Sequence, residues 1–470
     1  MLLDLASAFR RRDLSAHELV REALDRIDRL NGSLNAVVRV RPEALQDAMT
    51  LDARHSRSGP GVSAATLPLA GLPFLVKDVE DVAGLPTTHG SLLFADAPPA
   101  PADSGTVARL RAAGAIPVGK TNTSEFAFEG VTDNRLFGRT LNPWNRDWSP
   151  GGSSGGSAAA LAAGLAPIAT ATDAGGSSRG PAAVCGLVGL KPTNGLVGRA
   201  AAPPWLDLVT DGLMGTTVAD VALLLSILAG PQPGDVTAAP AWRPSPRPAL
   251  PQRILAAPRI QPGGPLPPEV DALFRAALRR LDRDLGLPVE EIAPEGIFPG
   301  LHHPDVDSLV LLEPETIAWL GRARVEAERE HFDRFFAVYV DEALGVTLDE
   351  YLAARRRRFD HARALDDLLG RDRVLVTPTL NTVGLLADGT MPGGGASPTN
   401  AGANTNPHNV TGHPAVSVPA GILPNGLPFG LLLTGPRYRD DLLLRLAAAW
   451  ERVAPWPLTA PRYEVFGVGR

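Results

Sequence analysis

The sequence predicts an α/β fold: one large domain in which helices cover a central β-sheet. Short apolar runs typical of buried strands alternate with stretches whose apolar residues recur at helical spacing. The chain has 470 residues, of which 44% are hydrophobic, and this is enough to build a large core. Strands mixed with many helices are typical of a sheet buried between helical layers.

In the first half of the chain, helix and strand signals follow one another from residue 15 to residue 172. Ser15-Ala-His-Glu18 has the pattern of a capping box, and the apolar residues that follow, up to Leu30, share one helical face. The helix expected over 157–163 is rich in alanine and is closed by Gly164. Its side chains are small enough for it to pack closely on all sides. In order, we expect a helix over 16–30, a strand over 72–76, a helix over 106–113, a strand over 116–118, a helix over 157–163 and a strand over 167–172.

The second half begins with a proline-dense segment, residues 231–268, which has little periodicity. We interpret it as a long surface connection between two halves of the core. Residues 388–406 are rich in glycine and asparagine and should form a loop, and Pro424-Asn-Gly426 should form a turn. The expected helices are 270–285, 313–336, 348–369 and one from Asp441, and the expected strands are 373–377, 415–418 and 430–434.

Composition limits the partners and the compartment. The net charge of -6 and the pI near 5.9 give no overall attraction to nucleic acid or to an anionic membrane. Residues 1–12 lack the apolar core of a signal peptide, and no later apolar stretch is long enough to span a bilayer. The single cysteine, Cys185, excludes an internal disulfide and a cysteine-rich metal site. We expect a cytoplasmic protein without nucleic-acid or membrane partners; a homodimer stays open.

Two glycine-flanked serine motifs are the strongest indication of function. They are Pro150-Gly-Gly-Ser-Ser-Gly-Gly-Ser157 and Thr172-Asp-Ala-Gly-Gly-Ser-Ser-Arg179. Glycine accepts positive φ and lets the main chain approach a reacting group closely. If Ser177 is a nucleophile, the turn around it would stabilise the oxyanion that attack creates. The predicted donors are the backbone N–H groups of Ala174, Gly175, Gly176 and Ser177.

A serine nucleophile needs a neighbouring base, and the sequence favours a lysine in this role. None of the nine histidines lies in either serine motif. Of the 45 basic residues only Lys77, Lys120 and Lys191 are lysine, and arginine does not lose its proton in a protein. Lys77 follows the apolar residues 74–76, which would desolvate the ammonium group and lower its pKa from about 10.4 toward neutrality.

A second hydroxyl is required if this lysine and the nucleophile are not in direct contact. Ser153 of the first motif could supply it. A relay from Ser177 through Ser153 to a neutral Lys77 would remove the proton during attack and return it to the leaving amine.

Five segments, in order and spacing, resemble the amidase signature family. They are residues 71–78, 119–126, 150–157, 172–181 and 189–193, and weaker similarity extends to 411–421, so the resemblance covers most of the chain. The resemblance implies that Ser177 is acylated, that Ser153 is a bridging serine on a cis peptide, and that Lys77 is the base. It also implies a mixed sheet between helices and a reaction without metal or other cofactor.

The expected organisation is one amidase signature domain over residues 1–470. We divide it into an N-terminal helical part (1–65), a signature core (66–230), the proline-rich connection (231–268), and a C-terminal half (269–470) that completes the sheet and the substrate pocket.

Some positions depart from the family pattern. Ser178 stands where a bulky aliphatic residue is common, Gly180 is a second departure, and Gly212-Leu-Met-Gly215 replaces the usual Gly-Pro-Met followed by a basic residue. These changes leave the three proposed catalytic residues intact and bear on substrate preference.

Several other reactive-looking residues are interpreted as structural. Lys120 and Lys191 should satisfy backbone carbonyls or carboxylates, and Asp173 and Arg179 should brace the second serine motif. His89, His413 and Cys185 are also expected to have structural roles.

The predicted reaction is metal-independent hydrolysis of an amide bond through an acyl-enzyme, with esters and carbamates as further substrates because they present the same carbonyl group. We expect the substrate pocket to be built from residues 123–130, including Thr123 and Gly130, from the helices after residue 300, and from the loop near residue 390.

Three alternatives remain at this point. Gly151-Gly-Ser-Ser-Gly155 fits the nucleophile elbow of α/β-hydrolases, which would make Ser153 the nucleophile of an esterase with His413 as its base. A nucleotide-binding module is weakly supported, because the glycine-rich loop lacks the Gly-Lys-Ser/Thr ending of a P-loop. The chain could also resemble the glutaminase subunit of the tRNA-dependent amidotransferase, which supplies ammonia to partner subunits.

Overall fold

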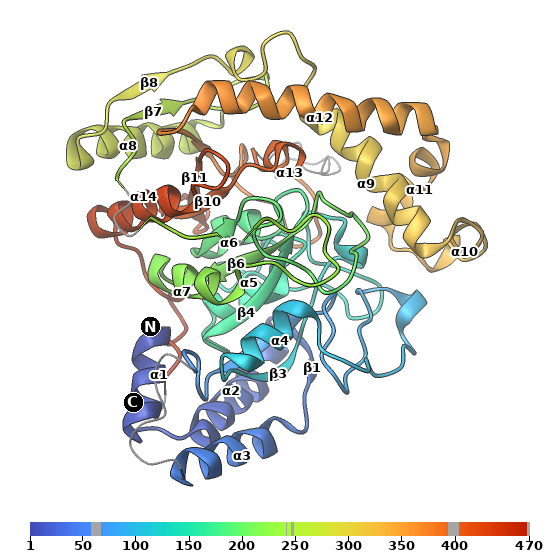
Figure 1. The fold of residues 1–470 in the computed structure, drawn as a ribbon, viewed down its shortest axis with the longest axis vertical. Helices are drawn as coiled ribbons and strands as arrows, with labels where there is room; N and C mark the ends of the chain where they lie inside the picture. The colour runs from blue at the N-terminus through green and yellow to red at the C-terminus, as the bar shows by residue number, and fades with distance from the viewer. Residues whose placement is uncertain (58–66, 241, 246–248, 393–403, 468–470) are drawn as a thin grey trace.

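An 11-stranded mixed β-sheet runs through the centre of the protein (Figure 1). The computed structural model describes residues 1–57, 67–240, 242–245, 249–392 and 404–467. The order of strands across the sheet is β1-β3-β2-β4-β6-β5-β10-β11-β9-β7-β8. The strands are β1 (Val37–Val40), β2 (Pro73–Lys77), β3 (Ile116–Thr121), β4 (Ile168–Asp173), β5 (Val188–Lys191), β6 (Thr210–Gly215), β7 (Arg253–Ala256), β8 (Val289–Glu291), β9 (Arg373–Pro378), β10 (Ala415–Ile422) and β11 (Pro428–Thr434).

Parallel and antiparallel pairs both occur in this sheet. Strand β2 lies between β3 and β4 and is parallel to both, and β7 is parallel to β8 and β9. The middle of the sheet, from β4 through β6, β5, β10 and β11 to β9, is antiparallel. The predicted α/β fold with a mixed central sheet is confirmed.

Helices surround the sheet and pack on one another. Helix α14 packs on α7, α8 and β10, whereas α5 packs on α6, and α6 also contacts β5, β10 and β11. The α-helices are α1 (Leu2–Arg11), α2 (Ala16–Leu30), α3 (Ala44–Arg57), α4 (Gly105–Ala112), α5 (Gly155–Ala162), α6 (Arg179–Cys185), α7 (Val218–Leu228), α8 (Pro268–Leu285), α9 (Pro304–Leu320), α10 (Arg322–Ala327), α11 (Arg334–Gly345), α12 (Leu348–Leu369), α13 (Pro407–Thr411) and α14 (Asp440–Val453).

Most of the elements expected from the sequence are present, with ends shifted by a few residues. The Ser15–Glu18 capping box is formed at the start of α2. Gly286 ends α8 in the left-handed conformation, with φ of 64°. The turn before β11 is closed by the Gly426 N–H, which donates to the Leu423 carbonyl at 2.9 Å. Within the described residues, the predicted loop 388–406 contains no helix or strand; its part 393–403 lies outside them.

Two predictions along the chain are wrong. The segment 231–268 is not only a surface connection, because β7 lies within it and is paired with β8 and β9 in the sheet. The single helix expected over 313–336 is instead three helices, α9, α10 and α11. Gly321, with φ of 88°, ends α9, and the Asp333 side chain accepts the backbone N–H groups of Phe335 and Phe336 to start α11.

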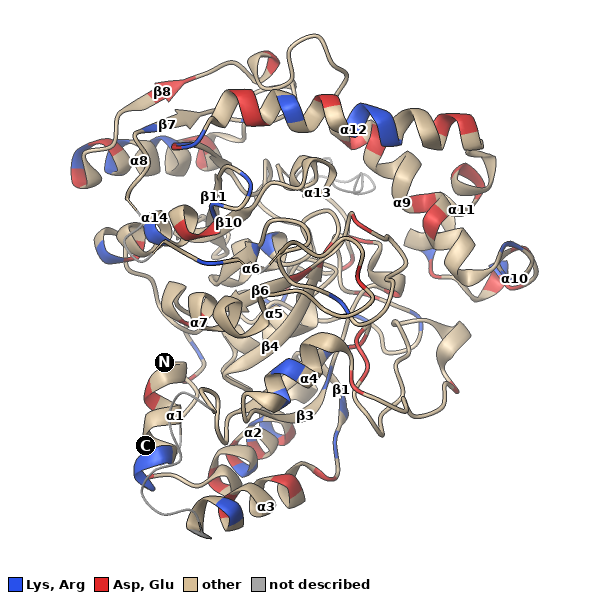
Figure 2. Ribbon diagram, viewed as in Figure 1, with Lys and Arg blue, Asp and Glu red and all other residues tan. Residues whose placement is uncertain are grey.

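Charged residues occur mostly along the outer helices, while the ribbon of the central strands is largely uncharged (Figure 2). Acidic and basic residues both occur along α8 and α12. Among the described residues, no helix combines the length and the apolar character that crossing a membrane would require.

Candidate active site

Lys77 and Ser153 are in direct contact inside the protein. Lys77 is the last residue of β2, Ser153 lies in the turn before α5, and the side chains of both are fully buried. The Lys77 Nζ atom lies 2.6 Å from Ser153 Oγ and 2.8 Å from Thr172 Oγ1. Because β2 and β4 are parallel neighbours, their carboxyl ends meet at one edge of the sheet, and this brings Thr172 to the lysine.

The environment of Lys77 favours its neutral form. Burial lowers the pKa of Lys77 to about 7, against the opposing effect of the carboxylates of Glu80 and Asp173. Glu80 is connected to the lysine through Thr170: the Thr170 hydroxyl donates to the Glu80 carboxylate and accepts the Lys77 backbone N–H at 3.0 Å. Burial also raises the pKa of Glu80 to about 8. This amine is therefore suited to accept a proton near neutral pH.

The backbone before Ser153 is held closely by its neighbours. The peptide bond between Gly152 and Ser153 is cis, as the family resemblance implies. A Cβ atom at Gly152 would lie 2.5 Å from the Glu129 carbonyl oxygen and 2.5 Å from the Val131 nitrogen, so only glycine fits here. The Thr132 hydroxyl donates to the carbonyl of Gly151 at 2.9 Å and fixes the turn from the other side.

The turn that carries Ser177 is built on a buried ion pair. Arg179 donates to Asp173 at 2.7 Å, and both side chains are fully buried. The same carboxylate accepts the Ser178 hydroxyl at 2.6 Å, so these residues brace the turn as predicted. From the other side, the Thr405 hydroxyl donates to the carbonyl of Gly175 at 2.6 Å.

The predicted set of four oxyanion donors is wrong for one member. The backbone N–H of Gly176 donates to Asp173 Oδ1 at 2.8 Å, so it is already engaged by a carboxylate. The N–H groups of Ala174, Gly175 and Ser177 remain as predicted donors.

Ser177 is half-buried and lines a cavity beside the first serine motif. Gly151 and Gly152 lie in the same wall, while Ser153 and Lys77 lie behind it, out of contact with solvent. The structure thus brings the two serine motifs to one cavity and places the buried lysine next to the first of them.

The cavity wall includes most of the segments expected for the pocket but not Thr123. Gly130 lines the cavity, as do residues of α9 and α11 and Met391 from the loop near 390. Thr123 does not: it is fully buried, and its backbone N–H donates to its neighbour Asn122 at 3.0 Å while its carbonyl accepts the Asn134 side chain at 2.8 Å. Thr123 therefore fixes the polypeptide behind the pocket.

The cavity is largely apolar and has one buried carboxyl group. Glu129 accepts hydrogen bonds from the Tyr339 hydroxyl and the Gly130 N–H, both at 3.1 Å, and burial raises its pKa to about 7. Among the described residues that line the cavity, none is lysine or arginine. Its apolar wall is formed by Phe128, Val184, Trp205, Leu309, Leu312, Leu380, Leu385 and Met391.

The other two lysines have the structural contacts that were expected. Lys120 donates to the Glu80 carbonyl at 2.6 Å and lies 3.1 Å from the Asp78 carboxylate. Lys191 donates to the Pro192 carbonyl at 2.8 Å and to the Asn194 side chain at 2.7 Å.

Among the described residues, His413 has a carboxylate of α12 as its partner and not the first serine motif. Its Nε2 atom lies 3.2 Å from Asp366 of α12, whereas Ser153 has Lys77 as its partner. His413 is therefore not positioned as the base that the nucleophile-elbow alternative requires. Cys185 is buried, its thiol lies 3.6 Å from the Pro150 carbonyl oxygen, and burial raises its pKa, as expected of a structural cysteine.

Sequence reasoning missed several residues of this site. Thr170 and Thr172 alternate along β4, and this period of two is a signal that both hydroxyls point to one face of a buried strand. No such signal marks Trp205, Glu129 or Tyr339, because they reach the cavity from separate loops and a helix.

Comparisons with known proteins agree on one family. The family model described as Amidase matches residues 18–444. The chain is 35% identical to an acylamidase of Rhodococcus erythropolis over 477 residues, which cover 96% of this chain and 95% of that protein. It is 37% identical over 484 residues to a glutamyl-tRNA(Gln) amidotransferase subunit of Synechococcus sp. (strain JA-3-3Ab), covering 96% and 91%. A solved bacterial aryl acylamidase of the amidase signature enzymes superposes with a TM-score of 0.85 at 28% identity, covering 96% and 95%.

Proposed function

Since this chain belongs to the amidase signature family, we propose that it is a serine amidohydrolase whose acyl-enzyme forms on Ser177. The observation that carries the proposal is the 2.6 Å contact between Lys77 Nζ and Ser153 Oγ, buried directly behind the cavity wall that holds Ser177. A neutral amine next to a hydroxyl can accept its proton, and this is the role of a general base.

In the proposed reaction, Ser177 Oγ attacks the carbonyl carbon of the substrate. Its proton passes to Ser153 Oγ while the Ser153 proton passes to Lys77 Nζ, so the lysine becomes an ammonium group. The backbone N–H groups of Ala174, Gly175 and Ser177 would stabilise the oxyanion. When the tetrahedral intermediate collapses, the C–N bond breaks and the proton returns along the same path to the leaving amine.

Hydrolysis of the acyl-enzyme repeats these steps with water as the nucleophile. Water gives its proton through Ser153 to Lys77 and attacks the ester carbonyl, and the Ser177 oxygen leaves with the returned proton. A carbamate or an ester presents an equivalent carbonyl group to Ser177, and we include both among the proposed substrates.

The cavity supports an apolar acyl or aryl amide as substrate. Aromatic and aliphatic side chains such as Phe128, Trp205 and Leu312 form much of its described wall. Apolar pockets gain affinity by removing apolar ligand surface from water. The names of the acylamidase relative and of the aryl acylamidase structure agree with this class of substrate.

The glutaminase role is the second candidate, because a glutamyl-tRNA(Gln) amidotransferase subunit is among the relatives. Free glutamine carries an α-carboxylate, which is best bound by a cationic side chain. The described residues that line the cavity include no lysine or arginine to bind this carboxylate. This feature favours the acylamidase role.

A substrate panel with an active-site label tests the proposal. We expect hydrolysis of an aryl acylamide such as an acetanilide, little or no hydrolysis of glutamine, and a fluorophosphonate label on the peptide that contains Ser177. Ser177→Ala should lose labelling and activity. Ser226→Ala is the control, because this exposed serine of α7 donates to the Leu223 carbonyl at 2.7 Å and does not line the cavity. A label on any residue other than Ser177 would refute the nucleophile, and a preference for glutamine would favour the second candidate.

A further inference from the structure

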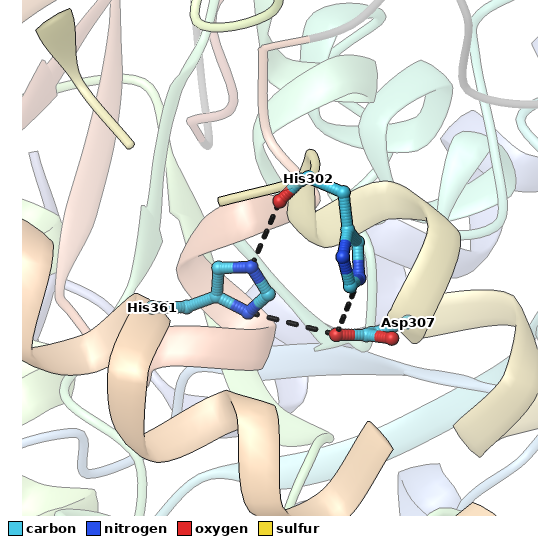
Figure 3. A group of neighbouring side chains, drawn as sticks. All are labelled: His302, Asp307 and His361. Atoms are coloured by element: carbon cyan, nitrogen blue, oxygen red, sulfur yellow. Dashed lines mark hydrogen bonds and ion pairs between the residues drawn. The ribbon is translucent and has the colours of Figure 1, made fainter. Parts of the chain in front are cut away.

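Two histidines and an aspartate converge where the start of α9 meets α12, away from the residues that line the reacting cavity. Figure 3 shows the rings of His302 and His361 directed at the Asp307 carboxylate. The His302 Nε2 atom lies 3.1 Å from Asp307 Oδ2, and the His361 Nδ1 atom lies 3.7 Å from the same oxygen. Asp307 and His361 are buried, whereas the His302 side chain is 44% exposed.

The hydrogen bonding of His361 fixes which nitrogen carries its proton. Its Nε2 atom lies 2.9 Å from the His302 backbone carbonyl, and a carbonyl only accepts, so Nε2 must be the donor. In the neutral ring, Nδ1 then presents a lone pair toward a carboxylate oxygen. This Nδ1 atom is buried and has no hydrogen-bond partner among the described residues. A lone pair facing an anionic oxygen in a buried place indicates that a positive charge belongs between them.

The separations of the two imidazole nitrogens from the Asp307 oxygen match a metal site. Ligand atoms bound at about 2.0–2.1 Å to a tetrahedral Zn²⁺ ion lie roughly 3.3 Å apart. The two separations from Asp307 Oδ2, 3.1 and 3.7 Å, bracket this value, and all three ligand atoms lie within 4.8 Å of one another. We propose that His302, Asp307 and His361 bind a divalent transition-metal ion of the zinc type, with solvent as the fourth ligand on the exposed side of His302.

A second partner of Asp307 is consistent with this assignment. Arg357 of α12 donates through Nη2 to Asp307 Oδ1 at 2.5 Å, while its Nε atom is 3.0 Å from Oδ1 and 3.1 Å from Oδ2. The arginine therefore orients the carboxylate mainly through Oδ1 and leaves Oδ2 facing the two rings. Partners that orient a ligating carboxylate in this way are common around metal ions. Two imidazoles and one carboxylate are a ligand set that zinc accepts.

The position of the site indicates what the ion would stabilise. It would join the first turn of α9 to the middle of α12, and α9 also supplies Leu309 and Leu312 to the cavity wall. The next residue, Ser308, accepts a hydrogen bond from the Asn406 side chain at 2.7 Å, close to Thr405, which holds the Ser177 turn. The ion would thus fix one wall of the pocket without touching the reacting atoms. This departs from the expectation that the chain holds no metal.

Metal binding to the whole protein tests the inference without any measurement of hydrolysis. The chelator-treated, dialysed protein is titrated with ZnCl₂ by calorimetry, and bound zinc is counted by mass spectrometry of the metal. We compare wild type with His302→Ala, and with His331→Ala as a control. His331 is a second exposed histidine beside a carboxylate, 42% exposed and 2.9 Å from Glu328.

We expect one equivalent of Zn²⁺ per wild-type chain, a higher melting temperature when it is bound, and unchanged binding by His331→Ala. Loss of His302 should weaken binding by roughly 10- to 100-fold or more. Because His302 is exposed, this variant should fold, and circular dichroism checks that it does. Absence of saturable binding by wild type would overturn the proposal, and so would His302→Ala binding Zn²⁺ as tightly as wild type.

Discussion

At the residue scale, the burial of Lys77 is the feature that determines the proposed chemistry. Among the described residues, its amine hydrogen-bonds to two hydroxyl groups, those of Ser153 and Thr172, and to no carboxylate. Lys120, by contrast, lies beside the carboxylate of Asp78. An amine without a paired carboxylate gives up its proton more easily when it is buried. The other buried lysine with a pKa lowered to about 7, Lys191, lacks a serine partner and does not line the cavity.

We predict that kcat/KM rises with pH through about 7 and then levels off, because the relay requires the unprotonated form of Lys77. Lys77→Met should lower kcat/KM by about 10²- to 10⁴-fold and remove this rise. Lys191→Met is the matched control, since it removes a buried lysine of similar pKa and should keep the rise. A Lys77→Met enzyme with the wild-type pH profile would contradict the assignment.

A second prediction concerns Glu80, which contacts Lys77 through Thr170. The pKa of Glu80 is raised to about 8, so this carboxyl group is largely protonated at the pH where Lys77 loses its proton, and Glu80→Gln replaces one neutral side chain by another. In Glu80→Gln, the midpoint of the rise in kcat/KM should therefore stay close to that of wild type. The measurement is a pH–rate profile of the variant beside wild type.

Asp81→Asn provides the control for this comparison. It removes an acidic residue adjacent in sequence whose carboxylate accepts the Thr87 hydroxyl at 2.6 Å. A clear fall of the midpoint in Glu80→Gln, larger than in Asp81→Asn, would show that Glu80 is ionised beside Lys77 and would contradict the prediction.

At the scale of elements, the turn between β4 and α6 depends on one ion pair. Asp173 and Arg179 are both fully buried, and the neighbouring Arg179 guanidinium and Ser178 hydroxyl hold the pKa of Asp173 well below its usual range despite burial. Removing one partner of a buried pair leaves the other charge without compensation. This turn carries Ser177, so its geometry and the fold depend on the same contact.

We predict that Asp173→Asn lowers the free energy of unfolding by about 3–5 kcal/mol. Asp271→Asn breaks an exposed pair on α8, in which Arg275 lies 2.9 Å from Asp271, and should cost only about 0.3–0.5 kcal/mol. Denaturant titration of the three proteins at neutral pH measures both values. Equal stability of the two variants would show that the buried pair contributes little.

The helices after residue 300 show why local patterns were not sufficient at this scale. Apolar residues continue at helical spacing through 313–336, yet a glycine with φ of 88° and an aspartate cap divide the segment into α9, α10 and α11. The divided helices fold back on one another: α11 and α10 both pack on α9. Only this arrangement brings Leu312 and Tyr339 to the same cavity.

At the scale of the whole molecule, one sheet joins the two halves of the chain. Strand β5, from the signature core, pairs with β10, from the C-terminal half, through Lys191 and Ala415, Leu190 and Val416, and Gly189 and Ser417. The cavity is also shared, because Ser177 comes from the first half and Leu309 from the second. Neither half has a complete sheet or a complete site alone.

We therefore predict that the two halves unfold together. Unfolding followed by tryptophan fluorescence and by far-ultraviolet circular dichroism should give one transition with the same midpoint, although chains of this length often unfold in steps. Trp205, in the first half, and Trp450, on α14, provide fluorescence probes on both sides of the β5–β10 junction. Two separated transitions would mean that the halves are independent units.

Much of the site was accessible from the sequence because its residues stand next to strong local signals. The serine motifs and Lys77 are adjacent to apolar strands or glycine-rich turns, and short-range sterics confine such turns to few conformations. The prediction failed where a role depended on distant residues. Thr123 is close in sequence to residues that line the pocket, but it is fully buried and does not line it. The Gly176 N–H donates to the carboxylate of Asp173, three residues earlier in the chain.

The sequence by itself determined the α/β class and most of the core strands, because periodicity and turn chemistry act over a few residues. The grouping of Lys77 with the two serine motifs came from the family resemblance. Only the tertiary structure decided which strands pair across the sheet, how α9 to α11 enclose the pocket, and that His302, Asp307 and His361 meet. The physical reason is that these contacts join residues far apart in the chain, where burial and packing of the whole fold, and no local preference, select the partner.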